Sequence, residues 1–165
     1  MAAQEAQPEA SSDTITAFMS ADHARIHKIW EETLTTLHAE DFNQLHERAG
    51  KFIAAFRRHI STEEQILFPA IEQRTGARDS GPTYAMRLEH REIERVLDGL
   101  KRLLTVEELW TGIQAVEGEP YDPTALFRSH ESKEHDVLYP HADKVVGADE
   151  ARKLIERMRT EVDKG

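Results

Sequence analysis

Apolar residues recur every three or four positions along most of the chain, which is the spacing of one face of an α-helix. Four long stretches show this spacing, and their apolar faces run from Ile15 to Leu37, from Leu45 to Ala70, from Met86 to Leu104, and from Phe127 through Val137 to Val145. No stretch alternates apolar and polar residues in the manner of a β-strand. The pattern therefore predicts an all-α fold.

Glycine, proline and capping residues predict where the helices begin and end. Gly76 is placed to cap the second helix, and the residues 105–108 (Thr-Val-Glu-Glu) resemble a capping box that opens a short helix through Val116. Asp122 followed by Pro123 predicts the start of the fourth helix, and residues 148–164 predict a fifth, C-terminal one. Residues 1–13 are poor in large apolar groups, so we expect a disordered tail before a domain at 14–165. Long helices joined by short turns favour an antiparallel up-down-up-down four-helix bundle, with the short helix before helix 4.

Each of the four long stretches carries ionisable residues on its apolar face, near the middle of the predicted helix. These residues are His23 on the first, His59 and Glu63 on the second, His90 on the third, and His130 and Glu134 on the fourth. Buried charges are costly without partners, so four helices would not assemble around bare His and Glu side chains. Histidines that are simply hydrogen-bonded in the core remain an alternative, but four at one level favour a metal site. A His and a Glu four positions apart lie on one helix face, so both can reach ions on the bundle axis.

The chain also contains an internal repeat. Residues 59–69 match residues 130–140 in His, Glu, Leu, an aromatic residue and Pro, and residues 22–26 match 89–93 in an acidic residue, His and Ile. Two helix hairpins related by an approximate twofold would explain both matches. This symmetry predicts two equivalent metal positions, each with two histidines, bridged by Glu63 and Glu134.

Composition narrows the chemistry further. The 165 residues include no cysteine, which excludes disulfides, zinc-thiolate sites and iron–sulfur ligation by this sequence. The net charge of -10, with acidic and basic residues mixed, makes nucleic acid an unexpected partner. No apolar run reaches membrane length and residues 1–10 lack the features of a signal peptide, so we expect a cytoplasmic protein that does not bind membranes.

The ordered set of residues resembles the hemerythrin-like (HHE) domains over about residues 14–146. The matching features are His23, His59-x-x-x-Glu63, Glu89-His90 and His130-x-x-x-Glu134, with Leu-Phe-Pro and Leu-Tyr-Pro after the two His-x-x-x-Glu motifs. The resemblance implies a non-haem centre of two iron ions with an oxo or hydroxo bridge. Such centres bind dioxygen, nitric oxide or peroxide, or register iron and oxygen status.

Two positions depart from the oxygen-carrying members of that family. The carriers have a further His one turn after the third-helix His, where this chain has Glu94, and an Asp five residues after the last-helix His, where it has His135. Glu94 and His135 are each candidates either for an extra ligand or for a hydrogen bond to a ligating His. The departures make the chain more similar to iron-sensing and iron-centre-repair members.

Three functions remain open from the sequence. The first is the binding or sensing of a small ligand such as dioxygen or nitric oxide, which the family resemblance favours. The second is an enzyme that acts on peroxide or nitric oxide, and the third is iron storage or delivery for the repair of iron centres. The sequence identifies no protein partner.

Overall fold

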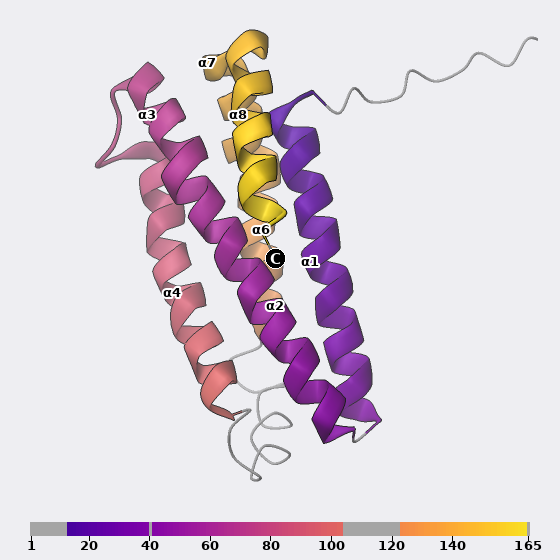
Figure 1. Cartoon of the computed structure of the whole chain (residues 1–165). Coiled ribbons are helices and arrows are strands. Elements are labelled where there is room, and N and C mark those ends of the chain that lie inside the picture. The colour runs from indigo at the N-terminus through magenta and orange to yellow at the C-terminus, as the bar shows by residue number, and fades with distance from the viewer. Residues whose placement is uncertain (1–12, 40, 104–122, 165) are drawn as a thin grey trace, which may run out of the picture.

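The structure, a computed structural model, describes residues 13–39, 41–103 and 123–164, and every regular element in these ranges is a helix. The elements are α1 (Ile15–His38), α2 (Phe42–Thr62), η1 (Glu63–Leu67), α3 (Phe68–Thr75), α4 (Gly81–Leu103), α6 (Pro123–Lys133), η2 (Glu134–Leu138), α7 (Tyr139–Val146) and α8 (Ala148–Val162). Figure 1 shows α1, α2 and α4 running alongside one another. In addition, α6 contacts α4, and α7 contacts α1. The predicted all-α class is confirmed.

Two of the long helices contain a π-helical turn at corresponding positions. In η1 the backbone N–H of Phe68 bonds to the carbonyl of Glu63, and in η2 that of Tyr139 bonds to the carbonyl of Glu134. A proline follows each turn, at the start of α3 and of α7. Proline lacks an N–H and its ring crowds the carbonyl four residues earlier, so the wider turn before it lets the helix continue.

Because of the π turns, some core positions differ by one residue from those that the sequence pattern predicts. Val137 was predicted to face the core but is 53% exposed, whereas the next residue, Leu138, is 1% exposed. Ala70, the last predicted core position of the second helix, lies in α3 and is only half-buried, whereas the next residue, Ile71, is buried. A π turn adds one residue to the helical repeat, so apolar positions after it face the core one residue later than in an uninterrupted α-helix.

The helix ends use the residues that the sequence indicated. Gly76 ends α3 in the left-handed conformation, with φ of 71°, and Pro123 is the first residue of α6. The N-terminus of α1 is bonded to a residue far away in the sequence. The Asp143 carboxylate accepts hydrogen bonds from the backbone N–H groups of Ile15 (2.7 Å) and Thr16 (3.1 Å). This contact joins the first helix to α7 across most of the sequence.

The apolar core consists of two separate clusters. One includes Met19, Phe68 and Leu138 together with the buried face of α8, and the other is built around Phe52, Phe56 and neighbouring residues of α1, α4 and α6. On each long helix the predicted histidine lies between a member of one cluster and a member of the other. The sequence therefore places a polar layer between two apolar ones.

Two predicted features lie outside the described residues. These are the disordered tail, which falls almost wholly in residues 1–12, and the short helix expected at residues 105–116. Among the described helices, none combines the length and the apolar character that crossing a membrane requires.

Candidate metal site

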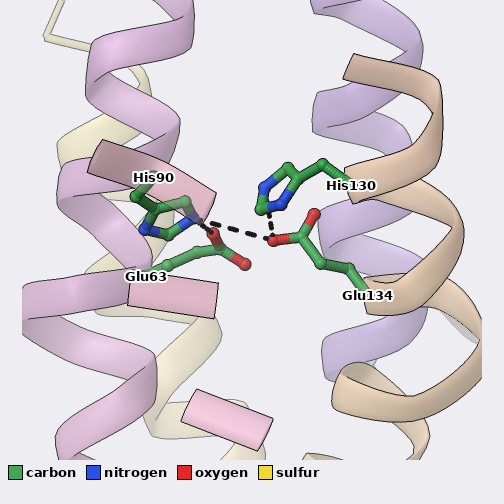
Figure 2. Close-up of side chains that lie close together, drawn as sticks. All are labelled: Glu63, His90, His130 and Glu134. Atoms are coloured by element: carbon green, nitrogen blue, oxygen red, sulfur yellow. Dashed lines mark ion pairs between the residues drawn. The ribbon is translucent and has the colours of Figure 1, made fainter. Parts of the chain in front are cut away.

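Four side chains from three helical stretches converge in the polar layer. Glu63, His90, His130 and Glu134 are all buried, and each offers one ligand atom within 4.8 Å of the others. Nε2 of His90 lies 3.1 Å from Oε2 of Glu63, and Nε2 of His130 lies 2.9 Å from Oε1 of Glu134. Figure 2 shows the Glu63/His90 pair and the His130/Glu134 pair pointing toward one another from facing helices. We call this group the His90/His130 position.

A second group lies beside the first and shares Glu134 with it. His23, His59 and Glu134 form this group, also with ligand atoms within 4.8 Å of one another. Nε2 of His23 lies 2.9 Å from Nε2 of His59 and 3.2 Å from Oε2 of Glu134. Glu134 thus turns one carboxylate oxygen to each group, as a bridging ligand would. We call the second group the His23/His59 position.

The structure brings the residues of the predicted metal positions together, and the bridging roles of Glu63 and Glu134 stay a prediction. Each group has two histidines, and Oε2 of Glu63 lies 3.1 Å from Nε2 of His90 in the first group and 3.6 Å from Nε2 of His59 in the second. Its other oxygen, Oε1, accepts a hydrogen bond of 2.9 Å from the Tyr139 hydroxyl. The same hydroxyl lies 3.1 Å from Oε2 of Glu134, so Tyr139 contacts both carboxylates.

All four histidines turn Nε2 inward and have a hydrogen-bond partner at Nδ1. The pairs of ring nitrogen and partner are His59 with Asp22 (2.9 Å), His90 with Glu64 (2.8 Å), His130 with Glu89 (3.1 Å) and His23 with Nε2 of His135 (3.0 Å). An acceptor at Nδ1 holds a proton there, so that Nε2 is the nitrogen whose lone pair a metal ion can use. Metal-ligating histidines in proteins have this arrangement.

The acidic partners reproduce the internal repeat. Asp22 precedes His23 and Glu89 precedes His90, yet each acidic residue accepts from a histidine of a different helix, His59 and His130 respectively. The equivalence of residues 22–23 and 89–90 thus extends to the groups that orient the histidines. The sequence showed the repeated acidic residues without showing which rings they contact.

The inward-facing atoms of the His90/His130 position have no hydrogen-bond partner. This holds for Oε2 of Glu63, Oε1 of Glu134 and Nε2 of both histidines. These four atoms lie close together, but none of them forms a hydrogen bond with another. Buried polar atoms without partners are rare and call for an ion or another bound group. A His and carboxylate donor set of this kind suits a divalent transition metal, so these residues fit the ion that the sequence predicted.

The nearby carboxylates raise the pKa values of two of the histidines. Burial opposes the charge on His90, but the Glu134 and Glu63 carboxylates outweigh it and raise its pKa to about 11. Burial opposes the charge on His130 as well, and Glu134 raises that pKa to about 9. The pKa of Glu134 is held well below its ordinary value despite burial, chiefly by His130. Without metal, protons on the histidines therefore neutralise the buried carboxylates.

Neither of the two additional ligand candidates belongs to a group of converging atoms. Glu94 pairs with Arg57 at 2.9 Å and its side chain is 38% exposed, so the structure places it outside the site. His135 contacts the outer nitrogen of His23 and has Ser20 at its other nitrogen, 3.2 Å away. Of the two alternatives for His135, the structure therefore matches the hydrogen bond to an inward-facing histidine.

Tyr139 is the site residue that the sequence analysis did not identify. Its hydroxyl lies 2.9 Å from Glu63 and 3.1 Å from Glu134, and the side chain is fully buried. Burial and the two carboxylates raise its pKa well above the ordinary value, so the phenol stays protonated and acts as a hydrogen-bond donor to the carboxylates. The signal was present in the repeat, where the Leu-Tyr-Pro of one half stands against the Leu-Phe-Pro of the other.

Comparison with known proteins gives an independent view of the chain. The family model described as the Hemerythrin HHE cation binding domain matches residues 14–122. His23, His59, Glu63 and His90 fall inside this match, while His130 and Glu134 lie beyond its end. No solved structure was found to match the chain.

Several curated bacterial proteins are similar to part of the chain. The iron-sulfur cluster repair protein YtfE of Edwardsiella ictaluri (strain 93-146) is 34% identical over 95 residues, which is 51% of this chain and 40% of that protein. The proteins of the same name from Yersinia pestis (strain Pestoides F) and Salmonella schwarzengrund (strain CVM19633) are 32% and 30% identical over stretches of the same length and coverage. The matched stretch is thus well under half the length of these relatives.

Proposed function

The chain belongs to the hemerythrin HHE cation-binding family, and from this premise we propose that it is a non-haem di-iron protein. In this proposal one iron ion occupies each of the two positions, with an oxo or hydroxo bridge between them. The centre binds a small ligand, dioxygen, nitric oxide or peroxide, in the sensing of oxygen, nitric oxide or iron or in a stress response. We further propose that the long helices form the antiparallel up-down-up-down bundle on which such a centre is built.

One observation carries the proposal. Four buried histidines direct Nε2 toward two buried carboxylates, and all four have their outer nitrogen fixed by a partner. A purely structural core would not maintain this many ionisable groups at one level, because each costs free energy to bury. Orientation by outer partners, in contrast, is what metal coordination requires.

Each side chain has a specific role in the proposed centre. His90 and His130 would hold one ion and His23 and His59 the other. Glu63 and Glu134, which each lie near histidines of both groups, would contact both ions. Bound iron would supply open coordination positions and a change of redox state. The Tyr139 hydroxyl orients the two carboxylates, and the apolar clusters above and below the layer exclude water from it.

Metal content tests the proposal directly. We expect the protein produced in iron-rich medium to contain two iron ions per chain, because the described residues offer two adjacent groups of ligand atoms. Elemental analysis, followed by absorption spectra during anaerobic titration with air and with nitric oxide, would measure both metal content and ligand binding. A spectrum that changes reversibly supports a binder, continuous consumption of peroxide or nitric oxide would indicate an enzyme, and a single ion per chain would contradict the dinuclear centre.

Iron delivery is a second candidate, which the similarity to iron-sulfur cluster repair proteins favours. The likeness covers 40% of that protein, so its activity comes to this chain only as a proposal. Rapid transfer of iron from the loaded protein to a mild chelator, or to a protein that lacks its iron centre, would support delivery. Iron that stays bound under these conditions would leave ligand binding as the function.

Proton release is expected to accompany metal binding. The pKa values of about 11 for His90 and about 9 for His130 mean that both rings are protonated in the metal-free site at pH 7. A metal ion needs their lone pairs, so binding must displace these protons. Calorimetric titration with iron(II) in buffers of different ionisation enthalpy would count the protons released. Binding without proton release would contradict ligation by these two histidines.

A further inference from the structure

A groove on the molecular surface lies apart from the candidate metal site. Its volume is about 630 Å³, and Val162 and Asp163 line it where α8 ends. Figure 1 shows α8 ending partway along α2, and α8 contacts both α1 and α2. Residues of α1 and α2 form the rest of the groove. Sites for small molecules are typically about 300–1,000 Å³, so the groove has room for such a ligand.

Small residues of α2 keep part of the groove open. Gly50 and Ala54 lie one turn apart on this helix, and both are exposed. A Cβ atom added at Gly50 would meet no atom within 4 Å, so the space above this residue is empty of protein. Ile29 of α1 and Ala55 of α2 add further apolar surface. A ligand in the groove can therefore place an apolar group against α1 and α2.

Basic residues outnumber acidic ones in the groove. Its lining includes the basic residues Arg25, Lys51 and Arg58 and the acidic residues Glu47 and Asp163. Lys51 and Glu47 pair with each other on α2. Asp163 is exposed, so water and salt screen its charge. The groove thus collects positive charge on a chain whose net charge is -10.

Arg58 carries a charge that no described residue neutralises. Its side chain is half-buried and has no hydrogen bond or ion pair within the described ranges, and its Nε is buried without a partner. The preceding residue, Arg57, in contrast donates to Glu94 at 2.9 Å and to Asp98 at 2.6 Å. A buried N–H group without an acceptor costs free energy. An anion in the groove would supply Arg58 with an acceptor.

Arg25 presents a second guanidinium group in a fixed orientation. Its Nε and Nη2 donate to Oδ1 of Asp22 at 2.9 Å and 2.7 Å. Oδ2 of Asp22 accepts from Nδ1 of His59 at 2.9 Å, which holds the carboxylate in place. A guanidinium has five N–H donors, and the bonds to Asp22 use two of them. The remaining donors are available to a ligand, and little side-chain freedom is left to lose when it binds.

We propose that this groove binds a small organic anion. Its carboxylate or phosphate group pairs with Arg58 and Arg25, and its apolar part lies over Gly50 and Ala54. Guanidinium groups suit both kinds of oxyanion, because their N–H donors match the spacing of carboxylate and phosphate oxygens. No residue that lines the groove belongs to the two groups of metal-ligand atoms. The proposal therefore does not rest on the proposed di-iron centre.

Calorimetric titration of the full chain with small aromatic probes tests which charge the groove selects. Phenylacetate carries a carboxylate and phenyl phosphate a phosphate group, whereas benzylamine is a cation and benzyl alcohol is neutral. We expect at least one of the two anions to bind at least about tenfold more tightly than benzylamine and benzyl alcohol, because hydrogen bonds between charged groups are the stronger ones. The anion that binds more tightly identifies the oxyanion that the groove prefers. Acetate and inorganic phosphate should bind more weakly, since they bury no ring.

Three variants test whether the anion binds in the groove. Arg58→Gln should weaken binding by about tenfold or more, because it removes a charged hydrogen-bond donor. Arg57→Gln removes the same charge one position earlier and should change the affinity less than about threefold, since Arg57 pairs with α4 and distant charges are screened. Gly50→Leu should abolish binding by filling the open space. Leucine favours a helix more than glycine does, so circular dichroism should show the helices retained.

Several results would overturn the proposal. These are no binding of either anion, binding that Arg58→Gln and Gly50→Leu leave unchanged, and equal weakening by Arg57→Gln and Arg58→Gln. Benzylamine or benzyl alcohol binding as tightly as the anions would show that the groove does not select negative charge. A Gly50→Leu variant that changes only the oligomeric state would identify an interface between copies of the chain instead. None of these results concerns metal content, so each would leave the proposed function intact.

Discussion

Replacing Glu134 with alanine is expected to release both metal ions. Its two oxygens lie 2.9 Å from Nε2 of His130 and 3.2 Å from Nε2 of His23, so it contacts both groups of ligand atoms. Loss of an outer partner already costs about 10- to 100-fold in affinity, so loss of a shared ligand should cost each ion more than about 100-fold. Equilibrium dialysis against iron(II) without oxygen would measure both constants.

Two other glutamates serve as graded controls for this substitution. Glu63→Ala should weaken both ions, the one at the His90/His130 position more, because Oε2 of Glu63 lies 3.1 Å from Nε2 of His90 and 3.6 Å from Nε2 of His59. Glu94→Ala should leave the metal content unchanged, since Glu94 is a partly exposed partner of Arg57 and such surface pairs contribute roughly 0–1 kcal/mol to stability. An effect of Glu94→Ala as large as that of Glu134→Ala would mean that α4 is rotated from the position described.

Much of the fold and of the site follows from the sequence. Helical periodicity predicts the long helices, and the six His and Glu residues on their apolar faces are those that the structure buries together. This inference works because a buried ionisable residue on an apolar helix face needs a partner. Ionisable residues on four packed helices can be partners for one another only where they lie at the same level of the helices. The end of α3 at Gly76 follows equally directly, since a left-handed residue favours glycine.

The remaining features depend on geometry that periodicity does not contain. The π turns at η1 and η2 move the core positions by one residue, which exposes Val137 and buries Leu138. The contact of Asp22 with His59 joins two helices, and no spacing along one helix can reveal it. The Tyr139 hydroxyl enters the site from the turn beyond Glu134, at a position where the pattern indicates only an apolar ring.

Removal of metal is expected to lower the melting temperature clearly while the protein stays largely helical. Ligand binding to the native state alone adds RT ln(1 + [L]/Kd), which is about 4 kcal/mol at a thousandfold excess over Kd. This is comparable to the entire stability of many domains, about 5–15 kcal/mol, and corresponds to a fall of roughly 10 °C for a chain of this size. Calorimetry of metal-loaded and stripped protein at pH 7 would measure the difference.

The pH dependence of the two forms should have opposite signs, which distinguishes ligation from simple ion pairing. In the stripped protein the pKa values of His90 and His130 are raised to about 11 and about 9, so their protonation stabilises the fold fully below the unfolded value of 6.5. That contribution is lost as the pH rises through the raised pKa values, so the stripped protein should become less stable above pH 6.5. The loaded protein should instead lose metal and stability as the pH falls, because protons compete for the same nitrogens. The difference in melting temperature should therefore widen from pH 6 to pH 9, and a constant difference would show that these histidines do not hold the metal.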